Sequence, residues 1–183
     1  MNTVIQTMID RRSIRAYTDE KITADEISTL KIAALSAPTA MNRQTQRFAF
    51  VTDSKIIDKV EAKVYESIVK AGETELAERI KSRNGKILYD TPLLIVITAK
   101  PGHFAPVDAG IAVENIALAA KSMGLDSVIL GMPARAFEGE DAAELYSDLR
   151  IPEDYKFMIA IAVGHPAMDK EPHEFDMSNC IDI

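Results

Sequence analysis

Three arginines and a serine fall within five residues near the start of the chain, at Arg11, Arg12, Ser13 and Arg15. A guanidinium presents its N–H donors in a planar fork that suits phosphate or carboxylate oxygens, and a serine hydroxyl adds a small donor without bulk. The whole chain is acidic, with a formal net charge of -7 at pH 7, so this basic cluster is a local feature. The cluster therefore predicts a binding site for an anionic group.

A purely structural role for these arginines is the alternative. Apolar residues at helical spacing precede the cluster and predict a short amphipathic helix that ends at it: Val4, Ile5, Met8 and Ile9. Cations are favourable at a helix C-terminus, so the arginines could cap this helix. They could also pair with nearby surface acids, namely Asp10, Asp19 and Glu20. The motif alone leaves both interpretations open.

The composition limits the class of protein. With 183 residues, of which 47% are hydrophobic, we expect residues 1–183 to form one domain with a sizeable core. The acidic balance argues against nucleic acid or an anionic membrane as a partner. One cysteine excludes an intramolecular disulfide, and three widely spaced histidines give no zinc pattern. The N-terminus lacks the uninterrupted apolar stretch of a signal peptide, and no run approaches the roughly 20 apolar residues of a membrane span, so we expect a cytoplasmic protein.

Helical and strand patterns alternate along the chain. Thr23 and Glu26 form a capping-box pattern for a helix that ends before Pro38. Further helices are predicted over 54–70, from Asp108 to Gly124 and around 142–149, and strands over 47–52, 93–98, 127–130 and 156–163. Residues 71–90 form either a charged surface helix, which we favour, or a mobile lid. The alternation predicts an α/β or α+β protein.

Four segments of the sequence, in their order and spacing, resemble the nitroreductase family of FMN-dependent oxidoreductases. These segments are 11–15, 37–44 (Ala-Pro-Thr-Ala-Met-Asn-Arg-Gln), 124–131 (Gly-Leu-Asp-Ser-Val-Ile-Leu-Gly) and 163–166 (Val-Gly-His-Pro). The resemblance covers almost the whole chain. It implies an α+β fold with a mostly antiparallel central sheet flanked by helices, built as an intertwined homodimer with FMN at the interface.

The resemblance also implies roles for individual residues. Arg11 and Arg12 would hold the FMN phosphate, Ser13 the phosphate or ribityl chain, and Arg15 the N1/O2 edge of the flavin ring. A loop from the partner chain would line the flavin through Pro38, Thr39, Ala40, Asn42 and Gln44. The backbone at the end of a strand would pass close to the flavin N5 through Ile129, Leu130 and Gly131. Without the resemblance, Ile129 and Leu130 are predicted as ordinary strand core.

Two departures from the family pattern affect these expectations. Met41 stands where a small residue is usual, and Thr45 and Gln46 follow Gln44 in place of a Pro-Trp pair. The family often completes the phosphate clamp with a cation near the C-terminus. Here Lys170 and His173 are the nearest candidates.

The activity that the resemblance implies is hydride transfer from NADH or NADPH, through FMN, to an organic acceptor such as a nitroaromatic or a quinone. The cofactor then carries the chemistry, so no side chain is expected to act as a covalent or acid–base catalyst. The alternatives are a flavin-binding homodimer without turnover, and a specialised branch that cleaves flavin or dehalogenates its substrate. The sequence names neither the acceptor nor the preferred nucleotide.

Overall fold

The protein is built on one antiparallel sheet. The computed structural model describes residues 1–82, 84–139, 142–171 and 174–183. Within these residues four strands pair in the order β1-β2-β4-β3, and every neighbouring pair is antiparallel. The strands are β1 (Gln46–Val51), β2 (Leu93–Ala99), β3 (Asp126–Leu130) and β4 (Lys156–Gly164). The α+β class with an antiparallel sheet is therefore confirmed.

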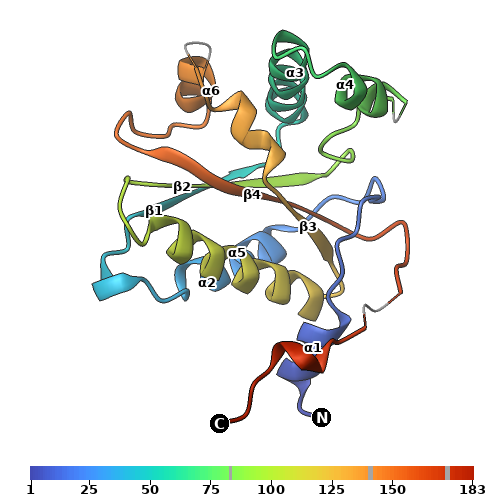
Figure 1. Ribbon diagram of the computed structural model, residues 1–183, viewed down its shortest axis with the longest axis vertical. Coiled ribbons are helices and arrows are strands. Elements are labelled where there is room, and N and C mark those ends of the chain that lie inside the picture. The colour runs from blue at the N-terminus through green and yellow to red at the C-terminus, as the bar shows by residue number, and fades with distance from the viewer. Residues whose placement is uncertain (83, 140–141, 172–173) are drawn as a thin grey trace.

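Helices cover both faces of this sheet (Figure 1). One face carries α3 (Ser54–Lys70), α4 (Thr74–Lys81) and α6 (Ala142–Asp148), and the other carries α2 (Ala24–Leu35) and α5 (Ala105–Ser122). Successive side chains of a strand point to opposite faces. Leu94 and Val96 of β2 accordingly pack in the core with α3, whereas Ile95 and Ile97 pack in the core with α5. Every residue of β2 is buried, as expected for a strand with a neighbour on each side and helices on both faces.

Helical periodicity explains why α3 covers its face of the sheet. Its buried residues recur at three- or four-residue spacing: Ile57, Val60, Val64 and Ile68. The helix begins after Asp53, whose side chain accepts a hydrogen bond from the Lys55 amide. Its bounds agree with the predicted 54–70. The predicted capping box of α2 is also present, because Thr23 and Glu26 each bond the other's backbone N–H.

The structure shows where α5 begins and which of the two interpretations of residues 71–90 is correct. The α5 helix begins at Ala105, not at Asp108, because Pro106 fits the first helical turn, where a missing N–H costs nothing. The helix ends before Gly124, as predicted, and Gly124 adopts the left-handed conformation at φ 83° that terminates helices. In the 71–90 stretch, the short charged helix α4 is present, as we favoured.

The two ends of the described chain lie together below the α5 side of the sheet. Helix α1 (Thr3–Asp10) and the short 3-10 turn η3 (Met177–Asn179) are both found there, close to the chain termini (Figure 1). The basic cluster begins at the C-cap of α1, so the predicted helix before it is confirmed. Among the described residues, no helix has both the length and the apolar character needed to cross a membrane.

Candidate functional site

The basic cluster continues into an extended segment, residues 13–18, which we call the strap. The Ile14 amide donates to the Ser127 carbonyl of β3 at 3.0 Å, and Ser13 forms an isolated bridge with the same residue. Further along, the Thr18 amide donates to the carbonyl of His165 at 2.9 Å, in the segment that follows β4. The strap therefore joins the edge of β3 to the end of β4, which brings together the first, third and fourth of the segments noted in the sequence.

Tyr17 fixes the middle of the strap. Its hydroxyl lies 2.9 Å from the Ile14 carbonyl oxygen and 3.2 Å from that of Ala162 in β4. Burial, with a smaller contribution from the charge of Asp126, raises the pKa of the Tyr17 hydroxyl above its ordinary value. The hydroxyl therefore keeps its proton at neutral pH and acts as a donor.

Arg15 points from the strap into a pocket of about 370 Å³, which we call the Arg15 pocket. The pocket lies between the strap, α4, the segment before β2 and the end of β3. Its lining residues are Arg15, Leu76, Arg79, Ile80, Lys86, Ile87, Tyr89, Leu130 and Met132. Thus Arg15 and Leu130, which come from two of the predicted motifs, line the same space.

Lys86 is a second cation of this pocket, and it belongs to none of the four motifs in the sequence. Its ammonium lies 2.5 Å from Asp90 and 3.8 Å from Glu61. The hydrogen bond that Lys86 donates to the Asp90 carboxylate raises the pKa of Lys86, so its positive charge is retained at neutral pH. Lys86 lies in a charged stretch where neither periodicity nor composition separates it from the surrounding surface lysines.

Arg12 is buried, and its side chain binds backbone oxygens. Its Nη1 donates to the carbonyl oxygens of Ile9 and Arg11, the latter at 2.6 Å, and its Nε donates to the Glu171 carbonyl at 3.1 Å. Arg12 therefore caps the end of α1 and ties the C-terminal segment to it. This arrangement corresponds to the helix-capping alternative from the sequence, which did not foresee the contact with residue 171.

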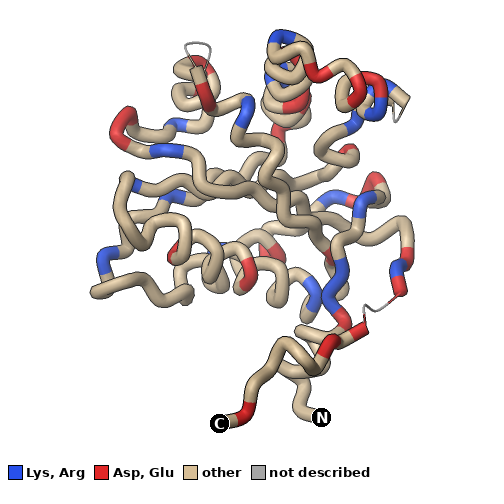
Figure 2. Tube along the Cα trace, viewed as in Figure 1, with Lys and Arg blue, Asp and Glu red and all other residues tan. Residues whose placement is uncertain are grey.

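Arg11, at the C-cap of α1, has an Nε donor that no described residue accepts. Its Nε lies 3.4 Å from the carboxylate of Glu114 on α5, but in a geometry that makes no hydrogen bond within the described residues. The ion-pair partner is therefore Glu114, and not one of the surface acids considered from the sequence. Figure 2 shows Lys and Arg segments gathering here, beside the C-terminal end of α5 and next to α1.

Replacing Arg12 with alanine should lower the free energy of unfolding by about 3 kcal/mol. Hydrogen bonds to a charged group contribute roughly 1.5–3 kcal/mol each and do not add fully, and the substitution leaves carbonyl oxygens without their donor. Urea unfolding followed by circular dichroism measures the change. Arg43→Ala removes an exposed guanidinium and should change stability by less than about 0.5 kcal/mol. Equal stability of the two variants would contradict an anchoring role for Arg12.

Residues 38–44, which we call the 38–44 loop, are organised around the start of α5. The Ala40 amide donates to the buried carboxylate of Asp108 at 3.1 Å. Within the loop, the Gln44 amide donates to the Thr39 hydroxyl at 3.0 Å, and the Gln44 side chain donates to Asn42 Oδ1 at 2.7 Å. The loop begins with Pro38 and places Met41 in an exposed position. Polar groups of the loop are therefore held in fixed positions by contacts within the chain.

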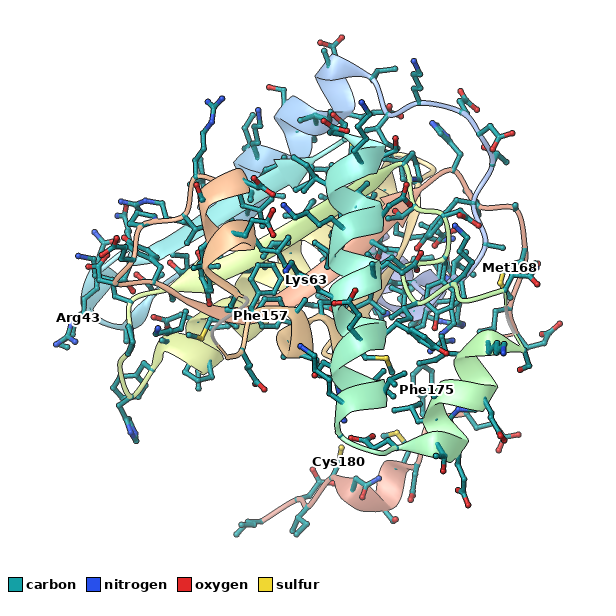
Figure 3. The ribbon with its side chains drawn as sticks, turned by 90° about the horizontal axis from the view of Figure 1, so that it is seen from above. Arg43, Lys63, Phe157, Met168, Phe175 and Cys180 are labelled. Carbon is teal, nitrogen blue, oxygen red and sulfur yellow. The ribbon has the colours of Figure 1, made fainter. Side chains whose placement is uncertain are left out.

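Within one chain, the 38–44 loop and the strap lie at opposite ends of the sheet. Figure 3 labels Arg43, from the loop, on one side of the molecule, and Met168, whose sulfur contacts the Arg15 amide, on the other side. Figure 1 places the two segments in the same way, on either side of α5. The structure of one chain therefore does not bring Thr39, Ala40, Asn42 and Gln44 to the Arg15 pocket.

The remaining predicted residues occupy three different environments. Leu130 lines the Arg15 pocket, Ile129 packs on the opposite face of the sheet with the α5 core, and Gly131 is exposed at the start of a 3-10 turn, η2 (Met132–Ala136). Lys170 is exposed and lies next to Glu171, the tail residue that contacts Arg12. The prediction for His173 falls outside the described residues.

Comparisons with known proteins agree on one family. The model of the Nitroreductase family matches residues 8–165. A relative from Archaeoglobus fulgidus, with a provisional name as NADH dehydrogenase/NAD(P)H nitroreductase, is 30% identical over 96% of this chain and 92% of its own. An FMN reductase [NAD(P)H] from Bacillus subtilis is 30% identical over 91% of this chain and 67% of its own.

A solved structure extends this agreement to three dimensions. The crystal structure of a nitroreductase with bound FMN from Desulfitobacterium hafniense has a TM-score of 0.94 and 30% identity, covering 100% of this chain and 99% of that one. The fold and the pocket define an α+β protein with a cationic pocket at the end of an antiparallel sheet. The chain belongs to the nitroreductase family.

Proposed function

We propose that this protein is an FMN-dependent oxidoreductase that passes hydride from NADH or NADPH to an organic acceptor such as a nitroaromatic or a quinone. The observation that carries the proposal is the convergence of Arg15, Lys86 and Leu130 on one pocket in a chain of this family. The FMN bound to the Desulfitobacterium hafniense relative and the name of the Bacillus subtilis relative support it.

The residues present fit FMN. The buried Nε of Arg11 has no hydrogen-bond partner among the described residues, so it is available to a phosphate, and the Ser13 side chain lies close by in sequence. Arg15 and Lys86 would face the polar edge of the flavin ring, while Leu130 would contact its apolar surface. Bound FMN would supply the hydride-accepting centre. The chain itself would supply position and a positive field around that centre.

Arg12 has a different part in this site from the one expected. Two of its nitrogens already donate to backbone oxygens, so we propose that it supports the phosphate site by holding α1 and the C-terminal segment together. Arg11 would then be the main phosphate-binding guanidinium. Lys170 would be close enough in the chain to contribute, since its neighbour Glu171 contacts Arg12.

We also propose that the site is completed in a homodimer of single-domain chains. The 38–44 loop lies far from the strap of its own chain, so a second copy must supply it if both segments contact one flavin. Large apolar side chains next to the loop are exposed, as expected for a surface that a partner covers. They come from α2, the loop itself and the start of α5: Ile32, Leu35, Met41, Phe104, Val107 and Ile111.

The purified protein should be yellow and dimeric, and NADH or NADPH should bleach its bound flavin. Anaerobic stopped-flow absorbance measures the bleaching, and light scattering on a dilute sample measures the mass. Bleaching followed by recovery of the flavin spectrum on addition of a quinone supports the reductase. A flavin that neither nucleotide bleaches would support a binding protein without turnover, and a flavin-loaded monomer would contradict the shared site.

A further inference from the structure

Arg79 of α4 is a cation of the Arg15 pocket that has no partner in the described part of the chain. No hydrogen bond or ion pair involves its guanidinium there. Glu75 lies one helical turn earlier but makes no ion pair with Arg79, and both side chains are exposed. Lys86, by contrast, has its charge compensated by Asp90 and Glu61. An exposed guanidinium without a compensating charge therefore lines the pocket.

Helix α4, which carries Arg79, is fastened to the wall of the pocket. Both Nη atoms of Arg135, in η2, meet the carboxylate of Glu73, the residue before α4, at 2.8 and 3.1 Å. Because both nitrogens contact the carboxylate, this bidentate ion pair fixes the orientation of Glu73 relative to Arg135 as well as the distance between them. The pocket residue Met132 belongs to the same turn as Arg135, so the position of Arg79 relative to that wall is set by the fold.

Arg79 also lies on the border between two hollows. A second hollow of about 560 Å³, which we call the outer hollow, lies at the start of α4 and shares Leu76 and Arg79 with the Arg15 pocket. Carboxylates of Glu73 and Glu75 line this outer hollow, whereas no carboxylate lines the described Arg15 pocket. Because Glu73 is paired with Arg135, Glu75 is the carboxylate that disfavours an anion on the outer side of Arg79, whereas no carboxylate of the described pocket lining opposes an anion on the inner side.

The remaining walls of the Arg15 pocket are mainly apolar. Their side chains are Leu76, Ile80, Ile87, Tyr89, Leu130 and Met132. Apolar walls with a few placed polar groups are typical of sites for small organic molecules. Arg15 and Lys86 are already assigned to the cofactor in the proposed function, so Arg79 is left for the molecule that exchanges electrons with it. A flat molecule with one anionic substituent matches this combination.

We propose that Arg79 is a specificity-determining residue that binds an anionic group, a carboxylate or a phosphate, on the substrate entering the Arg15 pocket. This inference rests on the proposed oxidoreductase function and names its substrate class. The anionic group could belong to the acceptor, as in an aromatic carboxylate, or to the nucleotide, as in the ribose phosphate that distinguishes NADPH from NADH. Both sources offer oxygens that match the guanidinium fork.

The test compares matched charged and neutral substrates on the FMN-loaded protein. The kcat/KM for 4-nitrobenzoate is divided by that for 4-nitrobenzamide, and the kcat/KM for NADPH by that for NADH. Arg79→Ala should lower one of these two ratios about tenfold, as expected for loss of a hydrogen bond between charged groups, and Arg79→Lys should restore part of it. Lys81→Ala is the control, because Lys81 is on the same helix but lines a different hollow.

The ratios identify the source of the anion. A fall in the acceptor ratio alone assigns Arg79 to an acceptor carboxylate, and a fall in the nucleotide ratio alone assigns it to the ribose phosphate. If neither ratio changes, or if Lys81→Ala has the same effect, the inference is overturned while the reductase function stands. If the wild-type flavin is never reduced, the proposed function fails. The role of Arg79 is then tested by the ratio of the dissociation constants of 4-nitrobenzoate and 4-nitrobenzamide, measured from the change in flavin absorbance on binding.

Discussion

Arg15→Ala should lower the midpoint potential of the bound FMN by about 30 to 60 mV. Reduction places negative charge on the N1–O2 edge of a flavin, and a fixed cation beside that edge stabilises the reduced form more than the oxidised form. Losing a charge-assisted contact is worth roughly 1.5–3 kcal/mol, and 30 mV corresponds to about 1.4 kcal/mol for two electrons. Flavin reduction by NADH or NADPH should slow accordingly, while FMN binding weakens less. Anaerobic potentiometric titration measures the shift.

Two variants separate the charge of Arg15 from unspecific damage. Arg15→Lys keeps the positive charge and should retain most of the wild-type potential. Arg47→Ala removes a guanidinium that lies over the Tyr155 ring, at 5.2 Å and outside the pocket, and should leave the potential unchanged. An Arg15→Ala protein with the wild-type potential would mean that Arg15 does not contact the polar edge of the flavin ring.

The sequence predicted the elements whose burial follows a regular period. The apolar spacing of α3 and the uninterrupted apolar run of β2 each have one structural interpretation, and the structure confirms both. The predicted start of α5 was wrong, because an aspartate such as Asp108 is typical of the first residues of a helix. In the structure its carboxylate instead accepts a hydrogen bond from the Ala40 amide. A long-range contact of this kind leaves no periodic signal in a sequence.

The candidate site was predicted in part, and the part that was missed has a common physical cause. Arg15 and Leu130 belong to motifs and meet in the pocket, because the strap pairs with the edge of β3. Lys86 and Arg79 belong to a charged stretch in which every lysine and arginine is equally consistent with a solvated surface. Only the fold of that stretch against the end of β3 distinguishes them from their neighbours.

The two roles considered for the basic cluster are divided between neighbouring residues. Arg12 is buried and donates to backbone oxygens, whereas Arg11 keeps a buried Nε without a hydrogen bond. Sequence alone treats the two guanidinium groups as equivalent. Their difference arises because α1 ends just before them, at Asp10, and the Arg12 side chain turns back over the carbonyls at the end of the helix.

Gly164→Ala should combine a large loss of stability with weaker FMN binding. A Cβ on Gly164 would lie 2.6 Å from Cδ1 and 2.8 Å from Cγ of Tyr17, and 2.9 Å from Cδ of Pro92. These ring atoms cannot move aside freely, because the Tyr17 hydroxyl is hydrogen-bonded to Ile14 and Ala162. Overpacking of this kind costs about 1–3 kcal/mol, and a clash that several fixed groups must share should reach the upper part of that range.

The effect on FMN follows from the position of Tyr17 in the strap. Displacing its ring moves the segment that carries Arg15, so FMN affinity should fall together with stability, although Gly164 does not line the Arg15 pocket. Thermal unfolding and quenching of flavin fluorescence measure the two effects. Gly102→Ala is the matched control, since its added Cβ would meet only the Lys100 carbonyl at 3.9 Å, and both measurements should stay at their wild-type values. A Gly164→Ala protein that is destabilised but binds FMN normally would show that the strap keeps Arg15 in place without Tyr17.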